Sequence, residues 1–465
     1  MNTAKNFHPS AYRPFYFLVA ATVFAFACLA KGNAAEWPRF RGADGSGRMR
    51  NQAFPSEWSN DKNIAWTAKI PGAGWSSPVS ANGKVFVTTA VFDDQPDPKG
   101  FRGGVSSMRT YRQDGERNRR STSFELHCLD LATGKELWSR RVVEKTPSFI
   151  IHPSNTYATE SPATDGDRIF AYFGAAGTVA AYDFTGKRLW KKEIGRFVSG
   201  NGFGSGSSLA VDGDKLLVQF DNDGEESFLA ALDTKTGDQI WKSTRDSRTS
   251  WSTPVVWNNS FQKVIVSCSA GMVTGHDPKT GKPIWRLTRF DGSFSSSPAL
   301  TPDHIFFGNS GPGSRGPLAA VSAKAKGNET LTLGQGAEWI TWTRAGSGPG
   351  LASPVAHNGL LYVTGGKGIL SCYRTSDGEM LYKERLPGAA SVAASLWIAG
   401  DQLFALDENG KTFVIATGPE FKVLCSNQID GLFWSTPSIV GDSLLLRSAD
   451  RIHCIRSTSK ALTSL

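Results

Sequence analysis

Short runs of alternating apolar and polar residues fill the chain from about residue 63 to its end. Examples are VFVTTA (85–90), IFAYFG (169–174), LLVQFD (216–221) and LLYVTG (360–365). Such runs, bounded by Gly, Asn, Asp or Pro, are typical of β-strands with a buried face. The pattern predicts an all-β protein.

The runs belong to a unit that occurs eight times. Each unit starts with a Ser/Thr-Pro-like pair, whose second residues are Pro78, Pro162, Leu209, Pro254, Pro298, Pro354, Leu396 and Pro437. Most of these markers are 41 to 47 residues apart, which is the length of one propeller blade. The first unit carries an insertion at residues 91–123, and the fifth carries a smaller one.

Two turns divide each unit into four strands. Asn-Gly or Asp-Gly pairs such as Asn82-Gly83 supply the positive φ of a two-residue hairpin turn. A second turn follows the pattern D-x-x-T-G-K, as in LHCLDLATGKELW (126–138) and VAAYDFTGKRLW (179–190), and leads into a fourth strand that ends in Trp. We interpret Trp66, Trp138, Trp190, Trp241 and Trp285 as packing residues of these strands.

The eighth unit ends without a Trp-bearing fourth strand. The segment NIAWTAKI (63–70) has the features of that strand and precedes the first unit. We therefore expect it to join the C-terminal strands and close the ring, which removes an exposed sheet edge. The predicted fold is one eight-bladed β-propeller of four-stranded antiparallel blades over residues 63–465, after an extension at 36–62.

The repeated pattern A-x-D-x-x-T-G-x-x-x-W resembles the pyrroloquinoline-quinone (PQQ) repeat family, and more distantly the WD40 and YVTN repeats. The likeness runs from WPRFRGADGSG (37–47) to IHCIR (452–456) and is similar to exported, planctomycete-type PQQ-like proteins. Within this family, quinoprotein dehydrogenases hold PQQ and calcium, whereas BamB-type proteins are binding scaffolds. The resemblance therefore implies a fold but leaves both functions open.

The N-terminus has the layout of a secretory signal. Lys5 and Arg13 precede the apolar run at 15–30, and small residues follow it up to Ala35. We expect residues 1–35 to be removed and the protein to be exported to the periplasm or cell envelope. Lipid attachment at Cys28 is the alternative. The mature chain has no apolar run long enough for a transmembrane helix.

The formal net charge of +9 falls to +6 without the signal. Much of the excess lies in the arginine-rich insertion 91–123, which is either a solvated mobile loop or a contact for an anionic surface or polymer. We expect an envelope protein or polymer as the partner, no nucleic acid, and a monomer.

The remaining cysteines form no disulfide framework. Cys128, Cys372 and Cys454 occupy one repeat position where other units have Ala or Gly, so we interpret them as small packing residues. His127, beside Cys128, then lies on the opposite face of the same strand.

The sequence contains no recognisable catalytic or metal-binding motif. A PQQ site requires an aromatic platform, calcium ligands and a carboxylate base, and the adjacent cysteine pair common in the dehydrogenases is missing. Residues 221–226 have their Gly at the wrong position for a calcium loop. The cofactor is unknown on this basis, and PQQ with calcium stays a hypothesis without supporting site residues.

The best candidate for a binding site is the mouth of the channel, where the loops that lead into the innermost strands meet. The candidate ligand-binding residues are Trp75, Asn155, Tyr157, Glu160, Asn201, Trp251, Arg344 and Trp434. The segment HPSNTYATE (152–160) has the most polar and titratable groups of these loops. The competing interpretation is that these residues only pack the blade tops. We expect a binding or scaffold protein; the alternative is a PQQ-dependent dehydrogenase of alcohols or sugars.

Overall fold

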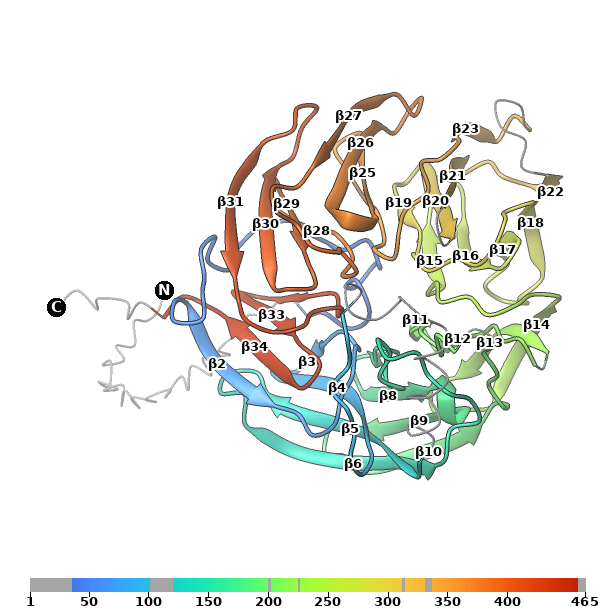
Figure 1. The fold of residues 1–465 in the computed structure, drawn as a ribbon. Coiled ribbons are helices and arrows are strands. Elements are labelled where there is room, and N and C mark those ends of the chain that lie inside the picture. Colours follow the sequence, from blue (N-terminus) through green and yellow to red (C-terminus); the bar gives the residue numbers. More distant parts are fainter. Residues whose placement is uncertain are drawn as a thin grey trace, which may run out of the picture. The chain divides into compact units, whose positions relative to one another are not determined.

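Eight antiparallel sheets follow one another along the chain and form a ring (Figure 1). The computed structural model describes residues 36–100, 120–199, 202–224, 226–311, 314–330 and 337–458. The eight-bladed propeller predicted from the repeat is confirmed. In this part of the chain, no helix is long and apolar enough to cross a membrane.

Each blade is numbered in chain order, with its innermost strand first. The strands are β3 (Val79–Ala81), β4 (Lys84–Val91), β5 (Thr122–Asp130) and β6 (Glu136–Lys145) in blade 1; β7 (Ala163–Thr164), β8 (Arg168–Phe173), β9 (Thr178–Asp183) and β10 (Arg188–Glu193) in blade 2; β11 (Ala210–Asp212), β12 (Lys215–Phe220), β13 (Ser227–Asp233) and β14 (Gln239–Arg245) in blade 3; β15 (Val255–Asn258), β16 (Lys263–Ser269), β17 (Met272–His276) and β18 (Pro283–Thr288) in blade 4. They continue with β19 (Ala299–Leu300), β20 (His304–Gly311), β21 (Ser314–Ser322) and β23 (Ile340–Arg344) in blade 5; β24 (Val355–His357), β25 (Leu360–Gly365), β26 (Ile369–Arg374) and β27 (Met380–Arg385) in blade 6; β28 (Trp397–Ala399), β29 (Gln402–Leu406), β30 (Lys411–Ala416) and β31 (Val423–Gln428) in blade 7; β32 (Ser438–Val440), β33 (Ser443–Arg447), β34 (Arg451–Ile455) and β2 (Ile64–Lys69) in blade 8.

Blade 8 contains both ends of the described chain. β2 pairs antiparallel with β34, with Trp66 opposite Cys454 and Thr67 opposite His453. In Figure 1 the blue strand β2 lies beside the red strand β34. The predicted closure by residues 63–70 is therefore confirmed, and it gives blade 8 its fourth strand.

Four additional elements lie outside this scheme. β1 (Arg48–Met49) pairs parallel with β28 of blade 7, and β22 (Gly327–Thr330) pairs parallel with β18 of blade 4. Single-turn 3₁₀ helices η1 (Gly174–Ala176) and η2 (Gly366–Gly368) connect the second and third strands of blades 2 and 6. β22 belongs to the smaller insertion that the spacing of the repeats predicted in the fifth unit.

Ser and Thr hydroxyls connect successive blades at the start of their innermost strands. Eight residues form this series, one in each blade. The backbone N–H of each of the first seven donates to the side-chain hydroxyl of the residue that follows it in the series, over 2.9–3.2 Å: Ser77, Ser161, Ser208, Thr253, Ser297, Ser353, Ser395 and Thr436. All eight residues immediately precede the Pro or Leu markers of the repeat. From Ser161 to Thr436, the Ser/Thr of each marker pair thus satisfies a buried donor of the preceding blade.

The Trp-bearing fourth strand joins each blade to the next. The Trp190 indole N–H donates to the carbonyl of Thr234, in the following blade's turn, over 3.0 Å. A Cβ added to Gly237 of that turn would lie 2.7 Å from the Trp190 ring. The same arrangement holds for Trp66 with Gly134, Trp138 with Gly186, Trp241 with Gly281 and Trp342 with Gly378. The Gly and Trp of the repeat are therefore contact partners across blades.

A bulge precedes each of these Trp positions. In every blade the outer strand has an extra residue at this point opposite the third strand: Ala65, Leu137, Leu189, Ile240, Ile284, Thr341, Leu381 or Leu424. The outer strand of blade 1 has a second one, Val142. Bulges bend an edge strand and disrupt its ladder, which discourages pairing with other chains.

The residue opposite the Trp is small. Cys128 faces Trp138, Cys454 faces Trp66 and Cys372 faces Tyr382, whereas Ala or Gly occupies this place in blades 2, 3 and 4. The five described cysteines are free. The interpretation of Cys128, Cys372 and Cys454 as small packing residues is confirmed.

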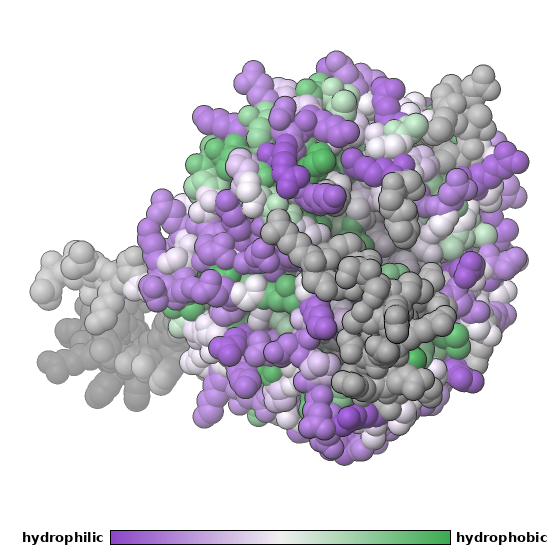
Figure 2. All heavy atoms as spheres, in the orientation of Figure 1, coloured by the Kyte–Doolittle hydropathy of each residue, from purple (hydrophilic) through white to green (hydrophobic). Residues whose placement is uncertain are grey.

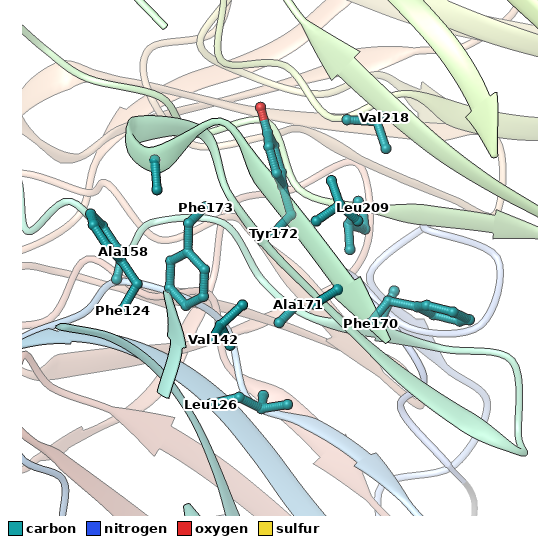
Figure 3. Close-up of a cluster of buried hydrophobic side chains, with 14 of the residues drawn as sticks. Phe124, Leu126, Val142, Ala158, Phe170, Ala171, Tyr172, Phe173, Leu209 and Val218 are labelled. Carbon is teal, nitrogen blue, oxygen red and sulfur yellow. The ribbon is translucent and has the colours of Figure 1, made fainter. Parts of the chain in front are cut away.

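The apolar core lies between neighbouring blades. Figure 3 shows the part between blades 1, 2 and 3, where Phe124 of β5 meets Phe173 of β8 at a ring distance of 5.2 Å; Val218 of β12 belongs to the same cluster. The face seen in Figure 2 is dominated by hydrophilic side chains, with hydrophobic residues in small separate groups. The core is thus distributed around the ring.

The segment 37–49 crosses the central channel. Trp37 exchanges backbone hydrogen bonds with Ser80 of blade 1, and Gly47 accepts from the N–H of Ile398 in blade 7. Between these contacts, the buried Arg41 donates to the carbonyls of Pro298 and Pro354, which precede the innermost strands of blades 5 and 6. The predicted N-terminal extension therefore fills the channel with the chain's own residues.

Candidate functional site

Two tryptophans pack together at the mouth of the channel. Trp75 and Trp434, from the loops that lead into blades 1 and 8, stack with ring centroids 5.9 Å apart. Trp75 is 5% exposed and its indole N–H donates to the carbonyl of Ser154 over 2.8 Å. Most of the Trp75 surface therefore serves packing, and only Trp434, which is half-buried, leaves ring surface open.

The segment 152–160 is held in place by its own polar side chains. The Asn155 carbonyl oxygen accepts the backbone N–H of Thr156 and Tyr157, and its amide donates to the carbonyl of Phe203. Tyr157 has a φ of 61°, is buried, and donates its hydroxyl to Phe149. Both residues thus shape the loop rather than project from it.

The nearby loops of blades 3 and 4 present an aromatic pair. The Trp251 indole N–H donates to the carbonyl of Gly204 over 2.8 Å, and its ring meets the edge of Phe203 at 6.2 Å. Phe203 is 36% exposed and lies 5.0 Å from the His152 ring, while Trp251 is half-buried. This pair is the most accessible aromatic surface of the described mouth.

Glu160 is fully buried next to these loops. One carboxyl oxygen accepts the N–H of Gly174 over 3.0 Å, and Ser205 also bonds the carboxyl group. The other oxygen, Oε2, has no hydrogen-bond partner. Burial raises the pKa of the Glu160 carboxyl to about 7. An acid in this environment is poorly suited to bind a cation in its ionised form.

The first part of the insertion passes over the mouth. The Lys99 N–H donates to the carbonyl of Pro153 in the loop of blade 2. A Cβ added to Gly100 would lie 3.0 Å from a carboxyl oxygen of Glu408 in blade 7 and 3.1 Å from Leu432 before blade 8. These contacts bring the insertion onto the same face as the predicted site. Residues 101–119, which contain five of the six arginines of the insertion 91–123, lie outside the described part.

Two predicted site residues do not belong to this group in the structure. Asn201 lies outside the described residues. Arg344 ends the outer strand β23 instead of lying in a loop before an innermost strand, and donates to the carbonyls of Asp377 and Gly378 in blade 6. Its placement at the mouth was wrong, because the insertion in the fifth unit obscured where that unit's fourth strand ends.

Sequence reasoning missed the buried charges next to the mouth. Arg447 is fully buried and donates to the carbonyls of Ser76 and Thr88 over 3.0 and 2.8 Å, and burial lowers its pKa to about 9. Asp221 and Arg245 form a buried ion pair of 2.8 Å in blade 3. The sequence contains only a weak sign that Arg447 is buried: it directly follows three leucines in a strand.

The described mouth does not fit PQQ with calcium. Calcium requires several carboxylate and amide oxygens, but the amide oxygen of Asn155 is occupied by backbone N–H groups, and burial raises the pKa of Glu160 to about 7, which disfavours its ionised form. Among the residues whose placement is given, no three His, Cys, Asp or Glu side chains group in a way that could hold a metal ion.

Comparisons with known proteins agree with the fold. The profile of the family described as outer membrane protein assembly factor BamB matches residues 122–297 and 315–418. The crystal structure of BamB from Moraxella catarrhalis superposes with a TM-score of 0.54 at 12% identity, covering 85% of this chain and 98% of that one. Quinohemoprotein alcohol dehydrogenase from Comamonas testosteroni gives a TM-score of 0.59 at 12% identity, covering 92% of this chain and 82% of that one.

One curated enzyme matches over a short stretch. Quinoprotein ethanol dehydrogenase of Pseudomonas aeruginosa is 31% identical over 122 residues. The match covers 25% of this chain and spans only about a fifth, 19%, of the enzyme. At these identities and coverages, the solved structures show the fold alone, and the enzyme match shows only a local similarity.

Proposed function

Because the chain belongs to the family described as outer membrane protein assembly factor BamB, we propose that it is a binding or scaffold protein whose partner docks on the channel mouth. The partner is an envelope protein or polymer. The proposal includes export to the bacterial envelope, for which the sequence of residues 1–35 is the basis.

The filled channel is the observation that carries this proposal. Segment 37–49 crosses the channel with Arg41 buried in it, and the fully buried Arg447 donates to the carbonyl of Ser76, the residue after Trp75. The accessible aromatic groups, above all Phe203 and Trp251, therefore lie on a surface of loops. A surface of this kind suits a macromolecule, whereas small ligands are usually enclosed in a cavity.

The loops of the mouth are also connected before any partner arrives. Asn155 bonds Phe203, and Trp251 bonds Gly204, so the loops of blades 2, 3 and 4 hold one another. A surface ordered in advance loses less conformational entropy on binding. Aromatic residues in such surfaces contribute a large share of binding energy.

A photo-crosslinker tests the docking surface directly. It replaces Phe203 at the mouth in one variant and Phe261 in another. Phe261 is 63% exposed in the turn between β15 and β16, at the opposite end of a blade. We expect a discrete crosslinked adduct in the native host from position 203 and none from position 261. Equal adducts from both positions, or adducts only from position 261, would contradict docking at the mouth.

A quinoprotein dehydrogenase is the second candidate, favoured only by the short match to the ethanol dehydrogenase. It predicts that PQQ with calcium raises the thermal midpoint of the purified protein and gives dye-linked oxidation of alcohols or sugars. Because the described mouth lacks the donor set, we expect no change in the midpoint. A rise of several degrees that requires both PQQ and calcium would favour the enzyme over the scaffold.

A further inference from the structure

Phe203 belongs to a short loop at the channel mouth, residues 203–206, which we name the Phe203 loop. Two neighbouring loops hold it through side-chain hydrogen bonds. The Asn155 amide of blade 2 donates to the carbonyl of Phe203. The Trp251 indole N–H of blade 4 donates to the carbonyl of Gly204 over 2.8 Å. The position of the accessible aromatic pair therefore depends on how firmly this loop is held.

Glu160 contacts the same loop from the interior of the protein. Its carboxyl group accepts the N–H of Gly174 over 3.0 Å and also the hydroxyl of Ser205. A Cβ added to Gly174 would lie 2.5 Å from Ser205 and 2.7 Å from a carboxyl oxygen of Glu160, so the three groups are in close contact. Because Gly174 lies in η1 of blade 2 and Ser205 lies in the Phe203 loop, the carboxyl group connects two blades.

The surroundings of Glu160 disfavour a negative charge. The side chain is fully buried, and Oε2 has no hydrogen-bond partner. Burial, and after it the charges of Glu160 and Asp221, raise the pKa of Tyr172, so both acids lie near this tyrosine. The buried cation Arg245 is paired with Asp221 over 2.8 Å. Burial raises the pKa of Glu160 to about 7, so the carboxyl group changes charge near neutral pH.

Other titratable and charged groups lie on the mouth side of the Phe203 loop. The His152 ring is 5.0 Å from the Phe203 ring, and burial lowers the pKa of His152 below its ordinary 6.5. His152 is therefore neutral at pH 7, where Glu160 titrates. Asp223 and Arg248, close to the loop of Trp251, form an ion pair of 3.2 Å.

We propose that Glu160 is a pH-dependent latch for the Phe203 loop: the protonated carboxyl group holds the loop in place, and ionisation releases it. A buried carboxylate with an unpartnered oxygen is costly unless water reaches it. Opening the close contact between Gly174 and Ser205 admits that water and frees the loop. Docking is then favoured at acidic pH, because an ordered surface loses less conformational entropy on binding. This role in docking rests on the function proposed above.

¹⁹F NMR of the full mature chain with 4-fluorophenylalanine at position 203 tests the latch without any partner. We expect the resonance to shift between pH 5.5 and 8.5 with a midpoint near pH 7, and to sharpen above it because the released ring moves faster. A chain labelled instead at position 261, in the turn between β15 and β16, is the control and should show no shift. A position-203 resonance that does not shift over this range overturns the proposal.

Three variants assign the midpoint to one residue. Glu160→Gln can accept the same two hydrogen bonds but cannot ionise, so its resonance should not shift near pH 7. Glu144→Gln removes an exposed carboxylate on β6 and should retain the wild-type midpoint. His152→Gln should retain it as well. A midpoint near pH 7 that persists in Glu160→Gln, or that disappears in His152→Gln, overturns the assignment to Glu160.

Docking is measured separately, with the photo-crosslinker at position 203 in envelope fractions buffered at pH 6 and at pH 8. If only the protonated form docks, a pKa of about 7 lowers the apparent affinity about tenfold between these pH values. We expect the adduct yield to fall accordingly, and to be equal at both pH values in Glu160→Gln. Equal yields in the chain with Glu160 overturn the regulation of docking. A shifting ¹⁹F resonance without any adduct would support the latch and contradict docking, and an adduct with an unshifted resonance would do the reverse.

Discussion

Glu160 illustrates how a single residue acquires unusual properties from its surroundings. The sequence shows only a glutamate in a polar loop. In the structure it is fully buried, with one oxygen bonded to Gly174 and the other unpaired. Such a group is costly to ionise, and the folded protein therefore retains its proton to a higher pH than the unfolded chain does.

This difference predicts how stability depends on pH. The ordinary pKa of 4.5 rises to about 7 on folding. The contribution of the Glu160 carboxyl to the free energy of unfolding is complete below pH 4.5 and is lost as the pH rises through 7. The total loss is about 3 kcal/mol. We expect Glu160→Gln, which has no charge to bury, to gain stability relative to the wild type by about that amount between pH 5 and 8. Urea unfolding of the wild type and of Glu160→Gln at pH 5 and at pH 8 measures this gain in stability.

The exposed Glu144 of β6 provides the control. Glu144→Gln removes a carboxylate without changing a buried site, so its stability difference from the wild type should stay nearly constant over the same pH range. Parallel pH curves for the wild type and Glu160→Gln would show that Glu160 does not retain its proton in the folded state.

At the scale of the element, the repeat motif describes a contact between blades. The Asp of each D-x-x-T-G turn accepts backbone N–H groups, as Asp233 does from Lys235 and Thr236. The Gly has a positive φ and also lies against the preceding blade's Trp. Gly237 has a φ of 73° and Gly213, in the hairpin between β11 and β12, a φ of 61°.

These two glycines separate backbone strain from interblade packing. A Cβ at Gly237 would meet the Trp190 ring at 2.7 Å, whereas nothing lies within 4 Å of a Cβ at Gly213. We expect Gly213→Ala to cost about 1 kcal/mol of unfolding free energy through strain, and Gly237→Ala about 2–4 kcal/mol because overpacking is added. Denaturant unfolding measures both. Equal losses of unfolding free energy in the two variants would mean that the Trp190 ring moves aside without an energetic penalty.

The ring of blades is closed by strands that are far apart in the sequence. β2 supplies the fourth strand of blade 8, and its Trp66 donates to the carbonyl of Leu131 in blade 1. Segment 37–49 adds contacts across the channel. The ring is therefore joined by residues that are nearly 400 positions apart, such as Thr67 and His453.

Two shortened chains distinguish the closing strand from the segment in the channel. A chain that starts at residue 59 retains β2 and should unfold cooperatively, at a lower urea midpoint than the chain that starts at residue 36. A chain that starts at residue 71 lacks β2 and exposes the edge of β34, so we expect broad unfolding and self-association. Tryptophan fluorescence in urea and size-exclusion chromatography measure these outcomes. Cooperative unfolding of the shortest chain at the midpoint of the longest would contradict the role of closure.

The sequence by itself determined the repeat, and through it the number of blades, their strands and the closing strand. This was possible because each blade uses local signals: alternating strands, turn residues with positive φ, and a Trp at a fixed distance from a Gly. The small residue at Cys128 could be interpreted correctly for the same reason, since its repeat position is shared by Ala181 and Ala231.

Only the tertiary structure decided which of the candidate site residues meet. Trp75, Asn155 and Tyr157 are largely committed to packing or loop geometry, Arg344 lies on an outer strand, and the accessible aromatic pair is Phe203 with Trp251. The channel-filling role of segment 37–49 was also beyond the sequence. All of these depend on contacts between residues of different blades, and a repeat pattern specifies the fold of each blade without specifying what its loops and termini touch.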